Sequence, residues 1–107
     1  ICQFTRLNDL NLGYNELTEL PDDIGQLTEL EMLNISHNNI GALPPSVARL
    51  TKLINLDLSN TQIPYLPKYI NDLNRLCILD VRNTRMRIPL PLATRIESNA
   101  VMAGYYK

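Results

Sequence analysis

Apolar residues recur along the chain in a pattern of 23 residues. The pattern L-x-x-L-x-L-x-x-N/T-x-L-x-x-L-P-x-x-I-x-x-L-x-x begins at leucines 7, 30, 53 and 76, strictly in three copies and more loosely in the fourth. Repetition at this period predicts a solenoid, in which each unit packs only against its neighbours. We predict a solenoid over 1–98, made of a partial repeat at 1–6 and repeats at 7–29, 30–52, 53–75 and 76–98, followed by a tail or frayed edge strand at 99–107.

Each unit contains two periodicities, as the second unit illustrates. Apolar and polar residues alternate over 33–35, which is the period of a β-strand with one buried face. After Pro44, the apolar residues Val47, Leu50 and Leu53 come three apart, which is the spacing of one side of a short helix. Proline is tolerated in a first helical turn because its missing N–H would have no partner there. Each unit is therefore predicted to be a strand, a turn and a short helical stretch.

A unit of this size cannot bury its own leucines, but stacked copies can share one core with their strands in parallel. Strands in a sheet lie about 4.8 Å apart. Helical stretches are bulkier, so we expect the sheet on the inner, concave side and the helices on the convex side. The predicted fold class is an α/β solenoid with a concave parallel sheet.

The chain resembles leucine-rich repeat proteins, through the L-x-x-L-x-L-x-x-N motif over residues 7–92. The strict L-P-x-x-I-x-x-L form is similar to intracellular Ras-associated signalling scaffolds, whereas LDLSNTQIPYLP and LDVRNT resemble plant immune receptors of the nucleotide-binding type. The resemblance implies that the ninth position of each unit forms a ladder of hydrogen bonds between turns. Threonine has one donor where asparagine has two, so we expect a less complete ladder in the last two units. The ninth residues are Asn15, Asn38, Thr61 and Thr84.

The first residues of the chain fit the helical half of an earlier unit. Ile1 and Phe4 take the places that Ile24 and Leu27 have in the first full unit. A solenoid end needs a polar or covering cap, which ICQF does not provide. We therefore expect the chain to be part of a longer repeat array.

Composition fits one soluble globular domain of 107 residues, with no apolar stretch near the length that a membrane span requires. The net charge of −1 argues against attraction of the whole molecule to nucleic acid. Charge is uneven along the chain, because residues 1–50 carry a net −5 and residues 51–107 a net +4. An acidic end and a basic end are expected. A solvated face or a contact with an acidic protein is favoured over nucleic acid for the basic run of Arg82, Arg85, Arg87 and Arg95.

Candidate chemistry is sparse, and we predict that the chain is not an enzyme. His37, Asp57 and Ser59 could be drawn as a triad, but they would stand on an open surface without oxyanion donors. Asp57 and Asp80 occupy equivalent positions in adjacent units, and two carboxylates alone are a poor calcium site. We expect a partner-contacting acidic pair, with no metal, cofactor or small-molecule substrate. Cys2 and Cys77 lie more than three units apart, too far for a disulfide, which fits a cytoplasmic location.

Strand side chains that point away from the core should form columns across the concave face. Residues there are free of packing duties while the backbone beneath them is rigid, which favours binding. The expected columns are Asp9, Met32, Asn55 and Ile78; Asn11, Asn34, Asp57 and Asp80; Gly13, Ser36, Ser59 and Arg82; and Tyr14, His37, Asn60 and Asn83. All of them except Gly13 and Ser59 are candidate partner-binding residues.

The pattern favours a protein-interaction module that holds a protein partner on its concave face, as part of a longer signalling or immune-recognition protein. An alternative is the substrate-targeting or autoinhibitory segment of a larger enzyme. A purely structural role, in which the segment spaces other domains, is a third. The flanking sequence would distinguish a scaffold from an immune receptor, because the receptor carries a nucleotide-binding domain upstream.

Overall fold

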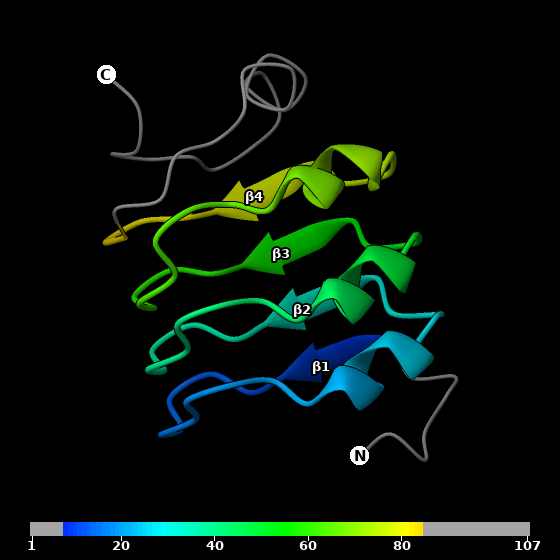
Figure 1. Ribbon diagram of the computed structural model, residues 1–107. Coiled ribbons are helices and arrows are strands. Elements are labelled where there is room, and N and C mark those ends of the chain that lie inside the picture. Colours follow the sequence, from blue (N-terminus) through cyan, green and yellow to red (C-terminus); the bar gives the residue numbers. More distant parts are fainter. Residues whose placement is uncertain (1–7, 85–107) are drawn as a thin grey trace.

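The computed structural model describes residues 8–84, in which short strands and short helices alternate. Figure 1 shows the strands stacked one above another, with a helix beside the sheet in each of the first three turns. The elements are β1 (Asp9–Asn11), η1 (Asp22–Gln26), β2 (Met32–Asn34), η2 (Pro45–Arg49), β3 (Asn55–Asp57), η3 (Lys68–Asp72) and β4 (Ile78–Asp80). The predicted solenoid with a parallel sheet on one side is confirmed.

The strands form one parallel sheet in the order β1-β2-β3-β4. Leu10, Leu33, Leu56 and Leu79 are partners in the register, so equivalent residues of successive units stand side by side. The ladder continues beyond the strands. For example, the N–H of Ile35 donates to the carbonyl of Asp57 at 3.0 Å. This register generates the columns of side chains that the repeat predicts.

The helices η1, η2 and η3 are single 3-10 segments of five residues each. A 3-10 helix has three residues per turn, which accounts for apolar residues three apart. The prolines that precede the helices lie outside the first turn, contrary to the prediction, because they have an extended backbone with ψ between 149° and 152°. These are Pro21, Pro44 and Pro67. Pro45 alone, among the described prolines, occupies a first helical turn.

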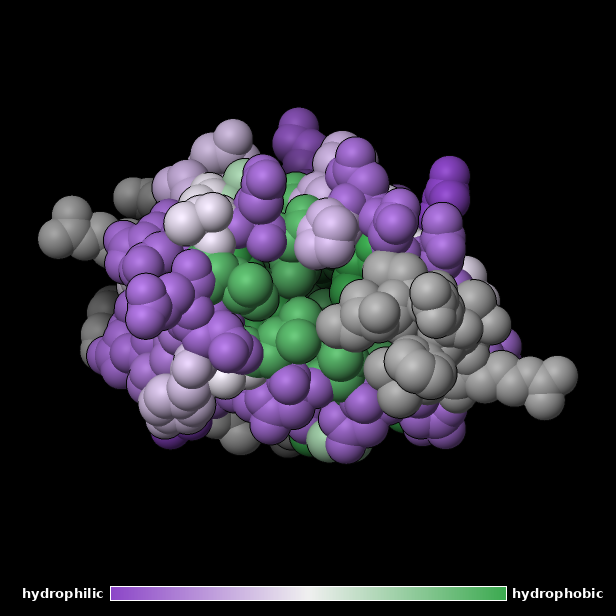
Figure 2. Space-filling model, turned by 90° about the horizontal axis from the view of Figure 1, so that it is seen from below, coloured by the Kyte–Doolittle hydropathy of each residue, from purple (hydrophilic) through white to green (hydrophobic). Residues whose placement is uncertain are grey.

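Leucine, isoleucine and valine side chains fill the interior of every described turn. Figure 2 looks along the stack from below and shows apolar side chains in the middle with a polar rim around them. Leu56 in β3 and Leu58 just after it are fully buried, whereas Asn55 and Asp57 of the same strand are partly exposed. The core therefore runs through the stack between sheet and helices, and the outer surface of the sheet is left to polar residues.

Asn38 joins two turns of the solenoid through its side chain, which is buried. Its amide group donates to the carbonyls of Leu12, Ile35 and Ser36 at 2.9, 3.0 and 3.1 Å, and its carbonyl oxygen accepts from the N–H of Leu17 at 3.0 Å. The equivalent threonines each make one hydrogen bond within their own turn, Thr61 to Leu58 and Thr84 to Val81. The predicted weakening of the ladder in the last two units is confirmed.

Several predictions concern residues outside the part of the chain that the structure describes. They are the partial repeat 1–6 with Ile1 and Phe4, the end of the fourth repeat, the tail 99–107, Cys2, and the arginines Arg85, Arg87 and Arg95. Within residues 8–84, no helix is long and apolar enough to cross a membrane.

Candidate functional site

Two adjoining grooves lie on the outer surface of the sheet, which we call the sheet face. The first, the upper groove, has a volume of about 390 Å³ and is lined by Tyr14, Asn34, Ser36, His37, Asp57, Ser59, Asn60, Arg82 and Asn83. The second, of about 190 Å³, is lined by Asp9, Asn11, Met32, Leu33, Asn34, Asn55 and Asp57. Of the candidate residues, only Ile78 and Asp80 line neither groove. Ser59, which lines the upper groove, was not among the candidates.

The second column of candidates ends each strand with a tight turn. The side-chain oxygen in each unit accepts a hydrogen bond from the backbone N–H two residues later. The pairs are Asn11 with Gly13 at 2.9 Å, Asn34 with Ser36 at 2.8 Å, Asp57 with Ser59 at 3.0 Å and Asp80 with Arg82 at 3.1 Å. Only Asn and Asp make this turn readily, so these residues have a structural role besides any role in binding. The signal was present in the sequence, because all four residues of the column are Asn or Asp.

Ser36 was expected to be exposed on the sheet face, and it is buried instead. Its relative exposure is 3%. Ser36 lies between the equivalent residues Gly13 and Ser59 of the neighbouring turns, and its hydroxyl is 3.1 Å from the position that a Cβ on Gly13 would take. A small side chain between close neighbours is covered, although its column faces outward.

Asp80 is also buried rather than exposed, because Arg82 covers it. The guanidinium of Arg82 donates to the Asp80 carboxylate at 2.6, 2.9 and 3.1 Å. This hydrogen bonding, together with the attraction of Asp80 and a smaller attraction of Asp57, raises the pKa of Arg82 above its usual value. The expected pair of free carboxylates is therefore not present. Asp57 lies beside Asp80, whose charge is paired with that of Arg82. Among the described residues, no group of three or more His, Cys, Asp or Glu side chains could hold a metal ion.

The fourth column adopts a backbone conformation that L-residues rarely take. The φ angles are 60° at Tyr14, 56° at His37, 56° at Asn60 and 59° at Asn83. The turn-to-turn ladder fixes these residues, since the N–H of Tyr14 donates to Ser36 and that of His37 to Ser59. Asparagine tolerates this left-handed conformation, whereas tyrosine is strained in it. The first unit thus places a tyrosine where glycine, asparagine or histidine fits better.

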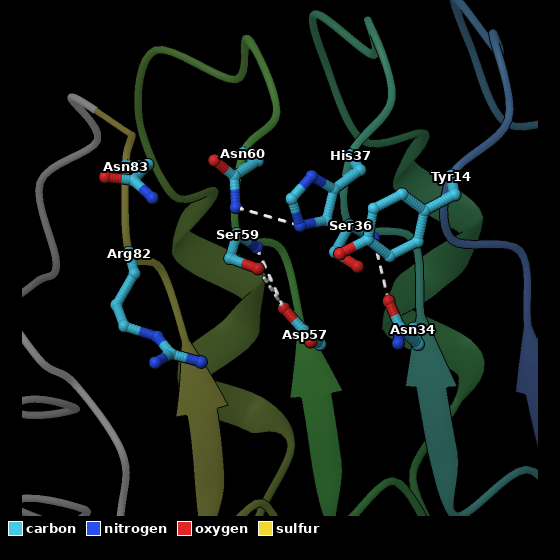
Figure 3. Close-up of a pocket in the computed structure, with 9 residues that line it drawn as sticks. All are labelled: Tyr14, Asn34, Ser36, His37, Asp57, Ser59, Asn60, Arg82 and Asn83. Carbon is cyan, nitrogen blue, oxygen red and sulfur yellow. Dashed lines mark hydrogen bonds between the residues drawn. The ribbon is translucent and has the colours of Figure 1, made fainter.

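The rings of Tyr14 and His37 are stacked, with centroids 4.0 Å apart and planes 11° from parallel. A hydrogen bond of 3.2 Å joins His37 Nε2 and Asn60 Nδ2. Figure 3 shows this row of side chains above the groove, with Arg82 on the side opposite Tyr14 and His37 and with Asp57 between them. Tyr14 is 77% exposed, so one wall of the upper groove presents an accessible aromatic surface.

His37, Asp57 and Ser59 do not form a catalytic triad. The hydroxyl of Ser59 donates to Asp57 Oδ1 at 2.7 Å, while the hydrogen bond of the His37 ring goes to Asn60. In a triad the serine hydroxyl donates to the histidine and the histidine donates to the carboxylate, and neither of these hydrogen bonds is present here.

Comparison with known proteins places the chain among repeat proteins. The family profile described as a leucine-rich repeat region matches residues 1–64. A leucine-rich repeat protein of Leptospira interrogans is similar to the chain, with a TM-score of 0.75 and 35% identity over 90% of this chain and 25% of that one. An internalin of Listeria monocytogenes has the same fold, with a TM-score of 0.71 and 24% identity over 96% of this chain and 37% of that one. No curated protein matches the chain.

Proposed function

The chain belongs to the leucine-rich repeat family, a family of protein-interaction modules, and from this premise we propose that it binds a protein partner on its concave sheet face. Tyr14 and His37 are the central contacts in this proposal. The single observation that carries it is the pair of stacked rings held at positive φ beside the upper groove.

Stability alone would not select Tyr14. A left-handed backbone costs a residue such as tyrosine roughly 1–2 kcal/mol, whereas asparagine and histidine adopt it more readily. Asn60 and Asn83 occupy the same position in the next two units, so the scaffold accepts asparagine there. The ring of Tyr14, which is 77% exposed, is costly to the fold and suited to a partner, because aromatic side chains on rigid frames are frequent binding hot spots.

The wider role is a further part of the proposal. The chain spans 25% and 37% of the two solved structures it is compared with, so the activity of a whole protein rests on more than these residues. We propose a signalling or immune-recognition role in the cytoplasm, where the exposed free thiol of Cys77 would stay reduced. Fractionation of the source cells tests the location, and recovery of the chain outside the cytoplasm would contradict it.

A capture experiment with matched variants tests the binding face. The chain, its Tyr14→Asn and His37→Asn variants and a Tyr65→Asn control are immobilised and exposed to extract of the source cells. Tyr65 is a suitable control because it is 66% exposed and lines neither groove. We expect proteins that the original chain and the control retain and that both groove variants lose. Equal capture by all four baits would contradict binding at this face.

A further inference from the structure

Acidic residues outnumber basic residues in the strand-bearing half of the described units. The segments that hold the strands and the loops after them, residues 8–20, 31–43, 54–66 and 77–84, contain six acidic residues and one basic residue. The helical segments, 21–30, 44–53 and 67–76, contain four of each and are neutral. The four columns of the sheet face contain three acidic residues, Asp9, Asp57 and Asp80, and one basic residue, Arg82, so this face carries a net negative charge.

The single basic residue of the sheet face does not offset this excess at the upper groove. Arg82 is held by Asp80 through its Nε and through a second nitrogen at 2.6 Å, and the two charges cancel. Asp57 is the other charged residue of the upper groove, and it forms no ion pair with the described residues.

Asp57 has one oxygen left for a ligand. Oδ1 accepts hydrogen bonds from the N–H of Ser59 at 3.0 Å and from its hydroxyl at 2.7 Å. Oδ2 accepts none within the described part of the chain, and the side chain is half-buried. A carboxylate in such a position is stabilised by a cation with several N–H donors.

The walls of the groove favour a flat cation. Tyr14 and His37 form an aromatic wall on one side of the groove (Figure 3), and the amide groups of Asn34, Asn60 and Asn83 also line it. A guanidinium group can contact an aromatic ring and donate to a carboxylate and to amide oxygens at once, which a compact ammonium group does less well.

From the free carboxylate oxygen, the aromatic wall and the charge of this face, we infer that the upper groove receives an arginine side chain from a basic segment of the partner protein. This inference rests on the proposed function and specifies the chemistry of the partner. It also implies that binding weakens as salt concentration rises, because exposed charges are screened.

The test uses a defined probe, the acetylated and amidated peptide Gly-Arg-Gly-Arg-Gly-Arg-Gly, beside a peptide in which citrulline replaces arginine. Citrulline keeps the shape and removes the charge. Binding to the 107-residue chain is followed by amide NMR shifts. We expect the arginine peptide to bind at least about fivefold more tightly, with shifts at Ser59 and Asn60. Equal affinities, no binding at millimolar peptide, or shifts confined to the helices would overturn the inference.

Two matched variants locate the charge that matters. Asp57→Asn removes the charge and keeps an oxygen for the turn, as Asn34 does in the preceding unit, so the fold is retained. Asp72→Asn makes the same change on exposed η3. Asp57→Asn should remove the preference for arginine over citrulline, and Asp72→Asn should not. An unchanged preference in Asp57→Asn would count against the groove.

The two proposals fail in different ways. If Tyr14→Asn abolishes capture of a protein partner while the arginine peptide shows no preference for the groove, only the arginine inference is wrong. If capture is unaffected by Tyr14→Asn, the binding face itself is wrong.

Discussion

At the scale of single residues, polar side chains hold the turns of the solenoid in place. The Asn and Asp residues that end the strands close a turn in every unit, and Asn38 ties its own turn to the preceding one. The repeat predicted which residues would face outward. It did not predict that Ser36 and Asp80 would be covered, because their burial depends on neighbouring side chains, including an ion pair with Arg82, and not on the repeat itself.

Asn38 and Thr61 occupy the same position and should differ in importance. Asn38→Ala would remove four hydrogen bonds and leave the N–H of Leu17 and the carbonyl of Ile35 without a partner in the described part of the chain, whereas the carbonyls of Leu12 and Ser36 keep one each, and we expect a loss of about 2–4 kcal/mol in the free energy of unfolding. Thr61→Ala removes one hydrogen bond, to Leu58, with an expected loss of about 1 kcal/mol. Urea denaturation of both variants measures the difference. Equal losses would show that the bond between turns contributes little.

At the scale of elements, the strands follow the predicted register, and the helices are shorter and tighter than regular α-helices. In each of the first three units, five residues form a 3-10 helix between an extended proline and a leucine that ends the helix. The spacing of three was a signal for this geometry. The closeness of η1 and η2 could not be predicted from the repeat, because the position that brings them together is Gly25 in one unit and Ala48 in the next.

Gly25 in η1 lies close to residues of η2. A Cβ at this position would lie 2.7 Å from both the Cβ and the carbonyl oxygen of Ser46. Gly25→Ala should therefore lower the free energy of unfolding by about 1–3 kcal/mol. Gly41→Ala is the matched control, since a Cβ there meets no atom within 4 Å. Thermal unfolding of the two variants checks this, and an equally stable Gly25→Ala would mean that η1 shifts freely.

Tyr69 links η3 to the preceding unit and should make stability depend on alkaline pH. Its hydroxyl donates to the carbonyl of Pro44 at 2.8 Å, and burial raises its pKa from 10.0 to about 12. An unfolded chain loses this proton more easily, so the stabilisation is complete below pH 10 and is lost as pH rises toward 12. Urea denaturation across this range should show a shallower decline in Tyr69→Phe than in the original chain. Tyr65→Phe serves as control, and identical declines in all three would contradict the argument.

At the scale of the whole molecule, the repeat alone predicted a stacked core, a parallel sheet and a polar outer face, because every unit must bury its leucines against the next. The distribution of charge was harder to predict. Counting along the chain gave an acidic end and a basic end, and the described residues keep this difference, with a net −6 over 8–50 and a net +1 over 51–84. In addition, the strand-bearing halves of the units are acidic and the helical halves are neutral. Folding places residues far apart in sequence on one face, and a count along the chain does not show this.

The positive φ angles of the fourth column were also not predicted from the sequence. Tyr14 and His37 were predicted as outward residues, but their positive φ and their stacking emerge only from the three-dimensional structure. Asn60 and Asn83 at the same position were the available signal, since asparagine is common in this conformation.

The central claim is that Tyr14 and His37 serve binding and that Tyr14 does so at a cost to the fold. The most direct test compares the original chain with the Tyr14→Asn/His37→Asn double variant, measuring both the free energy of unfolding and the affinity for the captured partner. We expect stability unchanged or higher by up to about 2 kcal/mol, because relief of backbone strain offsets the lost stacking, and affinity at least about tenfold lower. A less stable variant that binds with unchanged affinity would contradict the claim and make the two rings part of the scaffold.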